Sequence, residues 1–264
     1  MQVTFFQRAK NSLKRRLGFP RKYVARDPFL VDDHLVQSVP HLFEALPNKK
    51  EEFARIWDEY REKHGQPWDP IRILQFMYLM DIASQAGQGD YIELGTHQGL
   101  MAKVIYKLMD PKCTLYCLDT FEGFVESDLK VESTIYQSTW KVGNFAPTSP
   151  EMVGNYIGGG KTPKNLKLVK GWFPQTFAGL EDKKWRFVHI DFDLYQPIKS
   201  AMELLWPNLL PGGVMVIHDY GCFGFPGAKK AVDEFFETIG LTPMHLGDRW
   251  GSVAVIKPKN PLKG

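Results

Sequence analysis

What the 264-residue sequence lacks narrows the class of protein first. It has no uninterrupted apolar run near the roughly 20 residues that a transmembrane helix needs. Residues 1–6 lead into basic residues rather than into an apolar stretch with a small-residue cleavage site, so we expect no signal peptide. No internal repeat is visible. The sequence is therefore not typical of a membrane-spanning, secreted or repeat protein.

Cysteine is scarce as well. The three cysteines, Cys113, Cys117 and Cys222, are odd in number and lack the spacing of a metal site. This pattern favours a reduced, cytoplasmic protein over a disulfide-bonded one. With 44% hydrophobic residues the chain is too apolar for intrinsic disorder, and its length suits one large domain with an extension.

Charge is uneven along the chain. Residues 1–26 hold eight basic side chains and no acid, and removing those eight charges from the net +3 leaves −5 for the rest. A mildly acidic body argues against a nucleic-acid partner. Residues 5–17 could form a basic amphipathic helix, and two interpretations stay open: peripheral contact with an anionic membrane, or packing on the protein itself or a sister subunit. We expect a homo-oligomer.

The chain is expected to have three parts: a basic segment (1–26), a helical N-terminal region (27–89) and a domain (90–264). Within the second part, residues 71–83 have helical periodicity, with Asp69 as a cap and Pro70 in the first turn. The residues expected on its apolar face are Ile71, Leu74, Met77, Tyr78 and Ile82.

From residue 90 onward, short apolar runs alternate with helical stretches. This alternation predicts an α/β fold with a Rossmann-like, doubly wound, mostly parallel sheet, in which ligands bind beyond the carboxyl ends of the strands. The expected strands are 90–94, 114–118, 166–169, 187–190, 214–217 and 253–256, and the expected helices include 100–109, 197–206 and 228–239.

The first two strand ends suggest a nucleoside-containing cofactor. Glu93 stands near the end of the first strand, and Gly95 and Gly99 form a glycine turn that runs into a helix. This turn lacks the G-x-G-x-x-G pattern of nicotinamide-dependent dehydrogenases, which argues against that class. Asp119 ends the second strand about 20 residues later, a position suited to ribose hydroxyls.

Carboxylates also follow the next buried strands. Asp191 and Asp193 follow residues 187–190, and His218 and Asp219 follow residues 214–217. Burying such carboxylates together is costly without a cation or a shared proton. Oxygen ligands with one imidazole suit Mg²⁺ or Mn²⁺, and a polar network without metal is the alternative.

Other residues have weaker support. His97 lies in the glycine turn and contacts either the cofactor or its own loop, whereas His189 lies inside a strand and is expected to be structural. Residues 143–160 are expected to form a loop that could act as a lid. The side chains that could line an acceptor pocket are Trp140, Tyr195, Tyr220, Phe223, Phe225, Arg249 and Trp250.

Together these motifs resemble the macrocin-type O-methyltransferases, S-adenosylmethionine-dependent and metal-dependent enzymes that methylate sugar hydroxyls of macrolide and aminocoumarin antibiotics. The resemblance covers about residues 70–257. The motifs that carry it, in chain order, are Glu93-x-Gly95-x-x-x-Gly99, Asp119-Thr120-Phe121-Glu122-Gly123-Phe124, Lys170-Gly171-Trp172-Phe173, Asp191-x-Asp193-Leu194-Tyr195 and Leu210-Pro211-Gly212-Gly213 to Asp219-Tyr220.

The resemblance implies a role for each matched residue. It makes Asp193 the general base and Asp191, His218 and Asp219 the metal ligands, although the family has an acid where His218 stands. The implied cofactor contacts are Glu93, Gly95, Thr96, Gly99, Asp119 and Thr120. The cofactors would be S-adenosyl-L-methionine and Mg²⁺ or Mn²⁺, and the partner a small-molecule or glycan hydroxyl acceptor.

Two other functions stay open at this point. A metal-independent methyltransferase acting on another small molecule would use the same cofactor turn. A non-catalytic methyltransferase-like scaffold would bind partners through its basic N-terminus, but it would have no reason to keep three costly carboxylates together.

Overall fold

The computed structural model describes residues 49–64, 69–136, 138–146 and 148–260. The basic segment and its expected helix lie outside these residues. The chain divides into two compact units, residues 1–70 and 71–264. In the first, α4 (Lys49–His64) stacks the rings of Phe53 and Trp57 with centroids 6.5 Å apart. The second contains the sheet and every residue of the predicted site.

The described part of the second unit forms a seven-stranded sheet with the order β3-β2-β1-β4-β5-β7-β6. The first five strands are parallel, and β7 and β6 are antiparallel additions at one edge. The strand order reverses between β1 and β4, so the predicted site lies at that reversal. The strands are β1 (Asp90–Leu94), β2 (Leu115–Asp119), β3 (Leu166–Lys170), β4 (Trp185–Ile190), β5 (Leu209–Ile217), β6 (Met244–His245) and β7 (Val253–Ile256).

The predicted mostly parallel, doubly wound sheet is confirmed, and each predicted strand is present within a few residues. Every residue of β4 is buried, as the unalternating apolar pattern of a central parallel strand requires. Strand β6 was missed because it has only two residues and both are exposed. Such a short edge strand has no sequence periodicity to detect.

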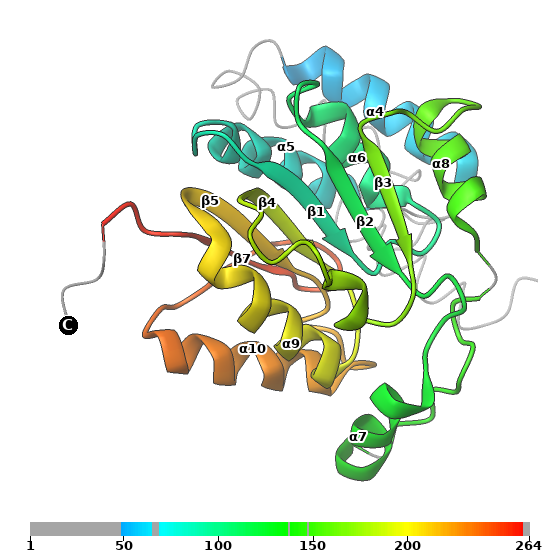
Figure 1. Ribbon diagram of the computed structural model, residues 1–264, viewed down its shortest axis with the longest axis vertical. Coiled ribbons are helices and arrows are strands. Elements are labelled where there is room, and N and C mark those ends of the chain that lie inside the picture. Colours follow the sequence, from blue (N-terminus) through cyan, green and yellow to red (C-terminus); the bar gives the residue numbers. More distant parts are fainter. Residues whose placement is uncertain (1–48, 65–68, 137, 147, 261–264) are drawn as a thin grey trace, which may run out of the picture. The chain divides into compact units, whose positions relative to one another are not determined.

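Helices connect the strands and cover both faces of the sheet (Figure 1). They are α5 (Pro70–Ser84), α6 (Leu100–Leu108), α7 (Glu126–Tyr136), α8 (Pro150–Gly158), α9 (Tyr195–Leu205) and α10 (Pro226–Ile239). The prediction of a loop over residues 143–160 was wrong for its second half, because Pro150–Gly158 form helix α8. Its start has a strong local signal, because the Ser149 hydroxyl accepts a hydrogen bond from the Met152 N–H and Pro150 occupies the first turn.

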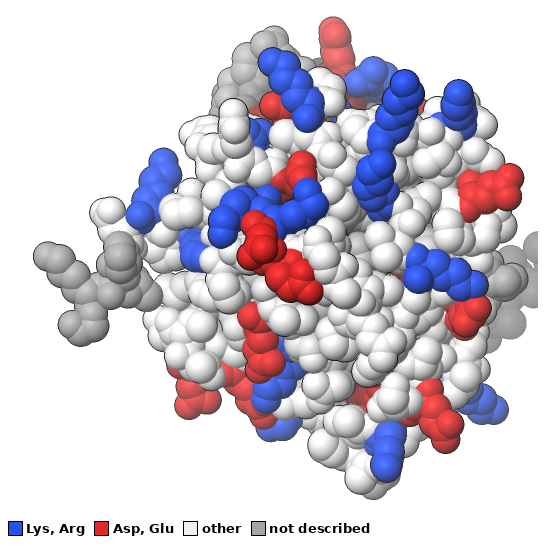
Figure 2. Space-filling model, in the orientation of Figure 1, with Lys and Arg blue, Asp and Glu red and all other residues white. Residues whose placement is uncertain are grey.

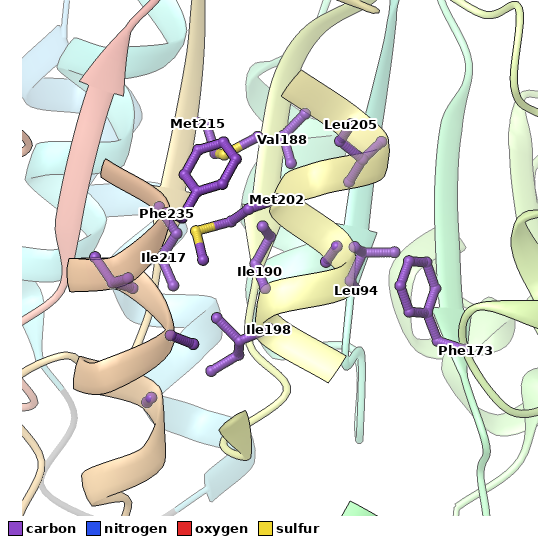
Figure 3. Close-up of a cluster of buried hydrophobic side chains, with 14 of the residues drawn as sticks. Leu94, Phe173, Val188, Ile190, Ile198, Met202, Leu205, Met215, Ile217 and Phe235 are labelled. Atoms are coloured by element: carbon purple, nitrogen blue, oxygen red, sulfur yellow. The ribbon is translucent and has the colours of Figure 1, made fainter. Parts of the chain in front are cut away.

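The two faces of β4 contact different layers, because side chains alternate along a strand. Val188 and Ile190 pack into the apolar cluster that α9 and α10 cover, together with Ile198 and Met202 (Figure 3). On the opposite face, the Phe187 ring lies 5.6 Å from a ring of α5. His189, two residues further along β4, therefore also faces α5, where its ring lies 4.9 Å from that of Phe76.

Helix α5 differs from the expected pattern. It is buried on most sides, and Ile82, expected on its apolar face, is 36% exposed. A helix that is apolar all round cannot show one clear face in sequence. The side chains it buries are Arg72, Ile73, Leu74, Phe76, Met77, Leu79, Met80 and Ala83. Its contacts with β4 place it in the same compact unit as the sheet rather than with the N-terminal region.

Helix α7 extends beyond the carboxyl ends of the parallel strands (Figure 1). Two buried carboxylates attach it to the domain. Glu132 accepts a hydrogen bond of 2.7 Å from the backbone N–H of Tyr195, at the start of α9. Asp128 accepts hydrogen bonds of 3.0 and 3.1 Å from the indole N–H of Trp172, which follows β3. These bonds hold α7 beside the end of the sheet where the site lies.

Two observations concern the helices and the visible surface of the described residues. None of the described helices combines the length and the low charge that crossing a bilayer requires. Figure 2 shows Lys and Arg side chains interspersed with Asp and Glu over the visible face of the described residues. This mixture agrees with the charge balance expected for the chain after residue 26.

Candidate active site

Strands β4 and β5 end side by side, which brings the four predicted polar residues to one place. Ile190 pairs with Ile217, and the His218 N–H donates to the Ile190 carbonyl at 2.9 Å. Asp193 and Asp219 have left-handed backbones, with φ of 63° and 60°. Aspartate adopts this conformation more readily than most residues. The chain thus turns sharply after each strand, next to the carboxyl ends of the sheet.

Three of these residues form a group that fits a divalent cation. One ligand atom each of Asp191, His218 and Asp219 lies within 4.8 Å of the others. Nδ1 of His218 is 2.7 Å from Oδ1 of Asp191 and 2.9 Å from Oδ2 of Asp219. Both ring nitrogens of His218 are buried, yet neither has a partner with hydrogen-bond geometry among the described residues. Two carboxylates and an imidazole are a chemically suitable donor set.

The charges in this group depend on one another. Burial and the Arg72 charge disfavour the His218 imidazolium, but the Asp191 and Asp219 carboxylates outweigh them and raise the pKa of His218 to about 9. In turn, His218 and Arg72 overcome the burial of Asp191 and lower the pKa of its carboxyl. Without a metal ion, the site therefore balances its carboxylates with a proton on His218 and with a guanidinium.

Asp193 lies next to this group and behaves differently. Burial raises the pKa of its carboxyl well above the ordinary value, and the neighbouring carboxylates of Asp219 and Asp191 raise it further. These causes favour the neutral carboxyl over the carboxylate, and a positive charge placed nearby would act in the opposite direction. Such an environment suits a group that exchanges a proton during the reaction.

The predicted glycine turn lies directly against the end of β4. Gly95 has φ of 82°, and a Cβ placed on it would stand 2.0 Å from the carbonyl oxygen of Asp191. Only glycine fits such an approach. Gly99 caps α6 with φ of 80°, and a Cβ there would stand 2.7 Å from Val153 of α8. The glycine turn therefore packs directly against the residue that begins the candidate cation site.

Asp119, at the end of β2, connects the two predicted cofactor turns. Its carboxylate accepts hydrogen bonds from the backbone N–H groups of His97 at 2.7 Å and Phe121 at 2.6 Å. Each carboxylate oxygen keeps a second acceptor position that a ribose hydroxyl could use. The Thr120 hydroxyl donates to the Gly123 carbonyl at 2.8 Å, so it stabilises its own turn.

The Glu93 side chain lies deeper than the sequence suggested. It is 2% exposed, and its Oε1 lies 3.0 Å from Nδ1 of His189. Burial raises the pKa of Glu93 well above the ordinary value. Its Oε2 and the Oγ1 of Thr96 are buried without a partner of hydrogen-bond geometry among the described residues. The Thr96 side chain nevertheless lowers the pKa of Glu93 through a hydrogen-bonding interaction, so these two groups act on each other beside the glycine turn.

Arg72 was missed in the sequence. Its Nη2 lies 2.9 Å from Oδ2 of Asp191 and 3.1 Å from Nε2 of His189. A signal was present, because Arg72 is the one basic residue of the mostly apolar helix α5. An arginine so placed is buried only when it is paired. The sequence could not show which acid it pairs with, since Asp191 is 119 residues away.

The predicted pocket aromatics separate into two groups. Trp140 and Phe225 stack with ring centroids 5.0 Å apart, and the Phe145 ring lies 5.6 Å from both Trp140 and His97. These rings border the glycine turn. Tyr195 and Tyr220 instead donate their hydroxyl groups to Glu234 and Asp233 of α10, at 2.6 and 2.8 Å. Phe223 projects fully into solvent.

The strand order and the strand-end site define a class I methyltransferase fold. The chain matches the macrocin O-methyltransferase (TylF) family over residues 71–253 and belongs to that family. It is accordingly an O-methyltransferase. The solved O-methyltransferase NovP shares the fold, with a TM-score of 0.59 at 19% identity, over 72% of this chain and 80% of that one. The calicheamicin methyltransferase CalS11 has a TM-score of 0.53 at 17% identity, over 97% and 94%.

Two curated relatives are O-methyltransferases, and the name of the first includes a rhamnosyl group. One is the 8-demethyl-8-(2,3-dimethoxy-alpha-L-rhamnosyl)-tetracenomycin-C 4'-O-methyltransferase of Streptomyces olivaceus, 28% identical over 193 residues, which are 67% of this chain and 73% of that protein. The other is the mycinamicin III 3''-O-methyltransferase of Micromonospora griseorubida, 26% identical over 180 residues, which are 65% and 70%.

Proposed function

We propose that this O-methyltransferase transfers the methyl group of S-adenosylmethionine to a hydroxyl group of a sugar or glycosylated small molecule, with assistance from Mg²⁺ or Mn²⁺. The observation that carries the proposal is the position of the ligand atoms of Asp191, His218 and Asp219, within 4.8 Å of one another and against the glycine turn. The methyl donor and the hydroxyl acceptor would thus meet where Asp191 packs against Gly95. The named sugar acceptors of the relatives support the substrate class.

The chain offers suitable groups to the methyl donor. Asp119 would accept hydrogen bonds from the ribose hydroxyls while it keeps the N–H groups of His97 and Phe121. Near the methionine end, the buried polar groups Glu93 and Thr96 lie at the glycine turn. A hydrogen bond from either group to the donor would couple donor binding to donor orientation.

Asp193 would take the proton of the acceptor hydroxyl. As the oxygen attacks the sulfonium methyl group, the new C–O bond forms, the C–S bond breaks and S-adenosylhomocysteine leaves. The hydroxyl proton passes to the Asp193 carboxylate. The raised pKa of Asp193 makes its ionised form a strong base at this position. The reaction needs no oxidant or further reactant.

Asp191, His218 and Asp219 would hold the divalent cation, which supplies a lower pKa for a coordinated hydroxyl group and a fixed position for its oxygen. The three residues come from the ends of two rigid strands, so their positions are defined before the acceptor arrives. To serve as ligands, Asp219 and Asp191 must keep their charges and His218 must give up its proton.

A metal-independent transfer is the second candidate, and one observation favours it. The protonated His218 and Arg72 already balance Asp191 and Asp219. In that case the Asp193 carboxylate would take the proton of the acceptor, with the His218 imidazolium beside it as a positive charge. Both candidates use the same donor site, so they differ only in their response to chelation.

The substrate proposal can be tested with isotope-labelled S-adenosylmethionine. The protein would be incubated with deoxysugar glycosides, the same compounds lacking single hydroxyl groups, and phenolic acceptors. Mass spectrometry should show one labelled methyl group on a sugar oxygen and none on the matching deoxy compound. Transfer to the phenolic acceptors alone would contradict the sugar assignment.

A further inference from the structure

The two oxygens of Asp191 have different partners. Oδ2 accepts a hydrogen bond of 2.9 Å from Nη2 of Arg72, and Oδ1 faces His218 at 2.7 Å. The Arg72 side chain is 10% exposed and that of Asp191 21%. A salt bridge this sheltered from water restrains its carboxylate more than a surface pair would. Oδ1 is therefore the oxygen turned toward His218, while Oδ2 is turned toward the guanidinium.

A second contact restrains Arg72 itself. The same Nη2 lies 3.1 Å from Nε2 of His189, and a guanidinium can only donate. Nε2 must therefore accept, which assigns the His189 proton to Nδ1. That N–H then donates to Oε1 of Glu93 at 3.0 Å.

The fold explains why these residues meet. Glu93 and His189 are register partners on β1 and β4, and Asp191 follows His189 by two positions, so the three share one face of the sheet. Helix α5 covers that face. Its Phe76 packs edge-to-face on the His189 ring at 4.9 Å and lies 5.8 Å from the Arg72 guanidinium carbon.

We propose that Arg72 is a positioning residue for the methyl-transfer site, held by His189 and Glu93 and acting through Asp191. It fixes the Asp191 carboxylate so that the guanidinium holds Oδ2 and Oδ1 faces His218, the acceptor oxygen and any bound cation. Helix α5, which precedes the first strand, thereby contributes to the active site. The proposal rests on the proposed function for its catalytic readout, but the geometry of Asp191 does not depend on the substrate.

Three variants separate orientation from charge. Arg72→Lys keeps a positive charge without the planar fork, Arg72→Met keeps the apolar stem, and Arg72→Ala leaves room for a small cation. The matched control is Arg186→Met, because Arg186 is also buried, at the amino end of β4, where it donates to the Gly87 carbonyl and lies 3.6 Å from Asp110. Circular dichroism and calorimetry with S-adenosylmethionine would establish folding and donor binding.

We expect Arg72→Met and Arg72→Lys to fold, to bind S-adenosylmethionine like the unaltered protein and to lose about 10- to 100-fold in kcat, as when the partner that orients a ligand is removed. Ethylguanidinium should restore part of the turnover of Arg72→Ala, and ethylammonium should not. A purely structural role would not produce this selective rescue. Wild-type turnover of Arg72→Met, or equal effects of the two cations, would overturn the proposal.

Two readouts keep this test independent of the proposed function. Mn²⁺ binding, followed by electron paramagnetic resonance without acceptor, should weaken about 10- to 100-fold in Arg72→Lys and remain unchanged in Arg186→Met. A crystal structure of Arg72→Met should show Asp191 Oδ1 turned away from His218. If the unaltered protein bound no Mn²⁺, the metal-assisted mechanism would be rejected. The position of the Asp191 carboxylate in the crystal structure would still test the role of Arg72. An unmoved Asp191 would contradict it.

Discussion

Nδ1 of His218 lies 2.7 Å from Oδ1 of Asp191, and both residues directly follow neighbouring parallel strands. This ion pair connects the ends of β4 and β5, and its two side chains are only 8% and 21% exposed. Its strength depends on the proton of His218, so it should be visible in the stability of the cation-free protein.

The pKa of His218 is raised to about 9, above the 6.5 of an ordinary histidine. A group whose pKa rises on folding stabilises the protein fully below its unfolded pKa and loses that contribution as the pH rises through the folded value. In chelator, the difference in free energy of unfolding between the unaltered protein and His218→Asn should therefore shrink between about pH 6.5 and pH 9. Urea unfolding at both ends of this range would check it. A difference that does not change with pH would contradict the charged pair.

Asp193→Asn should lower turnover about 100-fold or more, as expected for the loss of a general base. Asparagine tolerates the φ of 63° at this position, so the backbone should stay in place. Binding of S-adenosylmethionine, measured by calorimetry, should not change. Asp233→Asn, which alters a carboxylate on the outer surface of α10, is the control. Near-normal turnover of Asp193→Asn would remove it from the mechanism.

Asp119→Ala should weaken S-adenosylmethionine binding by about 1.5 to 3 kcal/mol, the scale of hydrogen bonds to a charged acceptor. Part of this loss would come from the turns, because the N–H groups of His97 and Phe121 lose their acceptor. Asp119→Asn keeps one acceptor oxygen and should lose less. Calorimetry measures both values, and an unchanged affinity in Asp119→Ala would reject the cofactor assignment.

Glu132→Ala should destabilise the protein by about 1 to 3 kcal/mol, because the buried N–H of Tyr195 loses its acceptor. The expected secondary effect is a looser attachment of α7. Glu126→Ala, an exposed position on the same helix, is the matched control. Denaturant unfolding gives both free energies. Equal stability of the two variants would show that the Glu132 contact does not hold α7.

The sequence predicted the parts of this fold that depend on local patterns. Apolar runs ending in acids located β4 and β5, and since parallel strands end at one edge, they also indicated that Asp191, Asp193, His218 and Asp219 meet. The contact between Arg72 and Asp191 could not be predicted, because it depends on how α5 crosses the sheet. The depth of Glu93 was missed for the same reason: its partner His189 becomes visible only through the strand register.

The central claim is that a divalent cation held by Asp191, His218 and Asp219 assists the transfer. The most direct measurement is the rate of methyl transfer by enzyme that has been stripped with a chelator and shown to be metal-free by elemental analysis, before and after Mg²⁺ or Mn²⁺ is restored. We expect transfer to stop without metal, S-adenosylmethionine binding to persist, and either ion to restore turnover. Metal-free enzyme that works at the normal rate would contradict the claim and favour transfer by Asp193 and His218 alone.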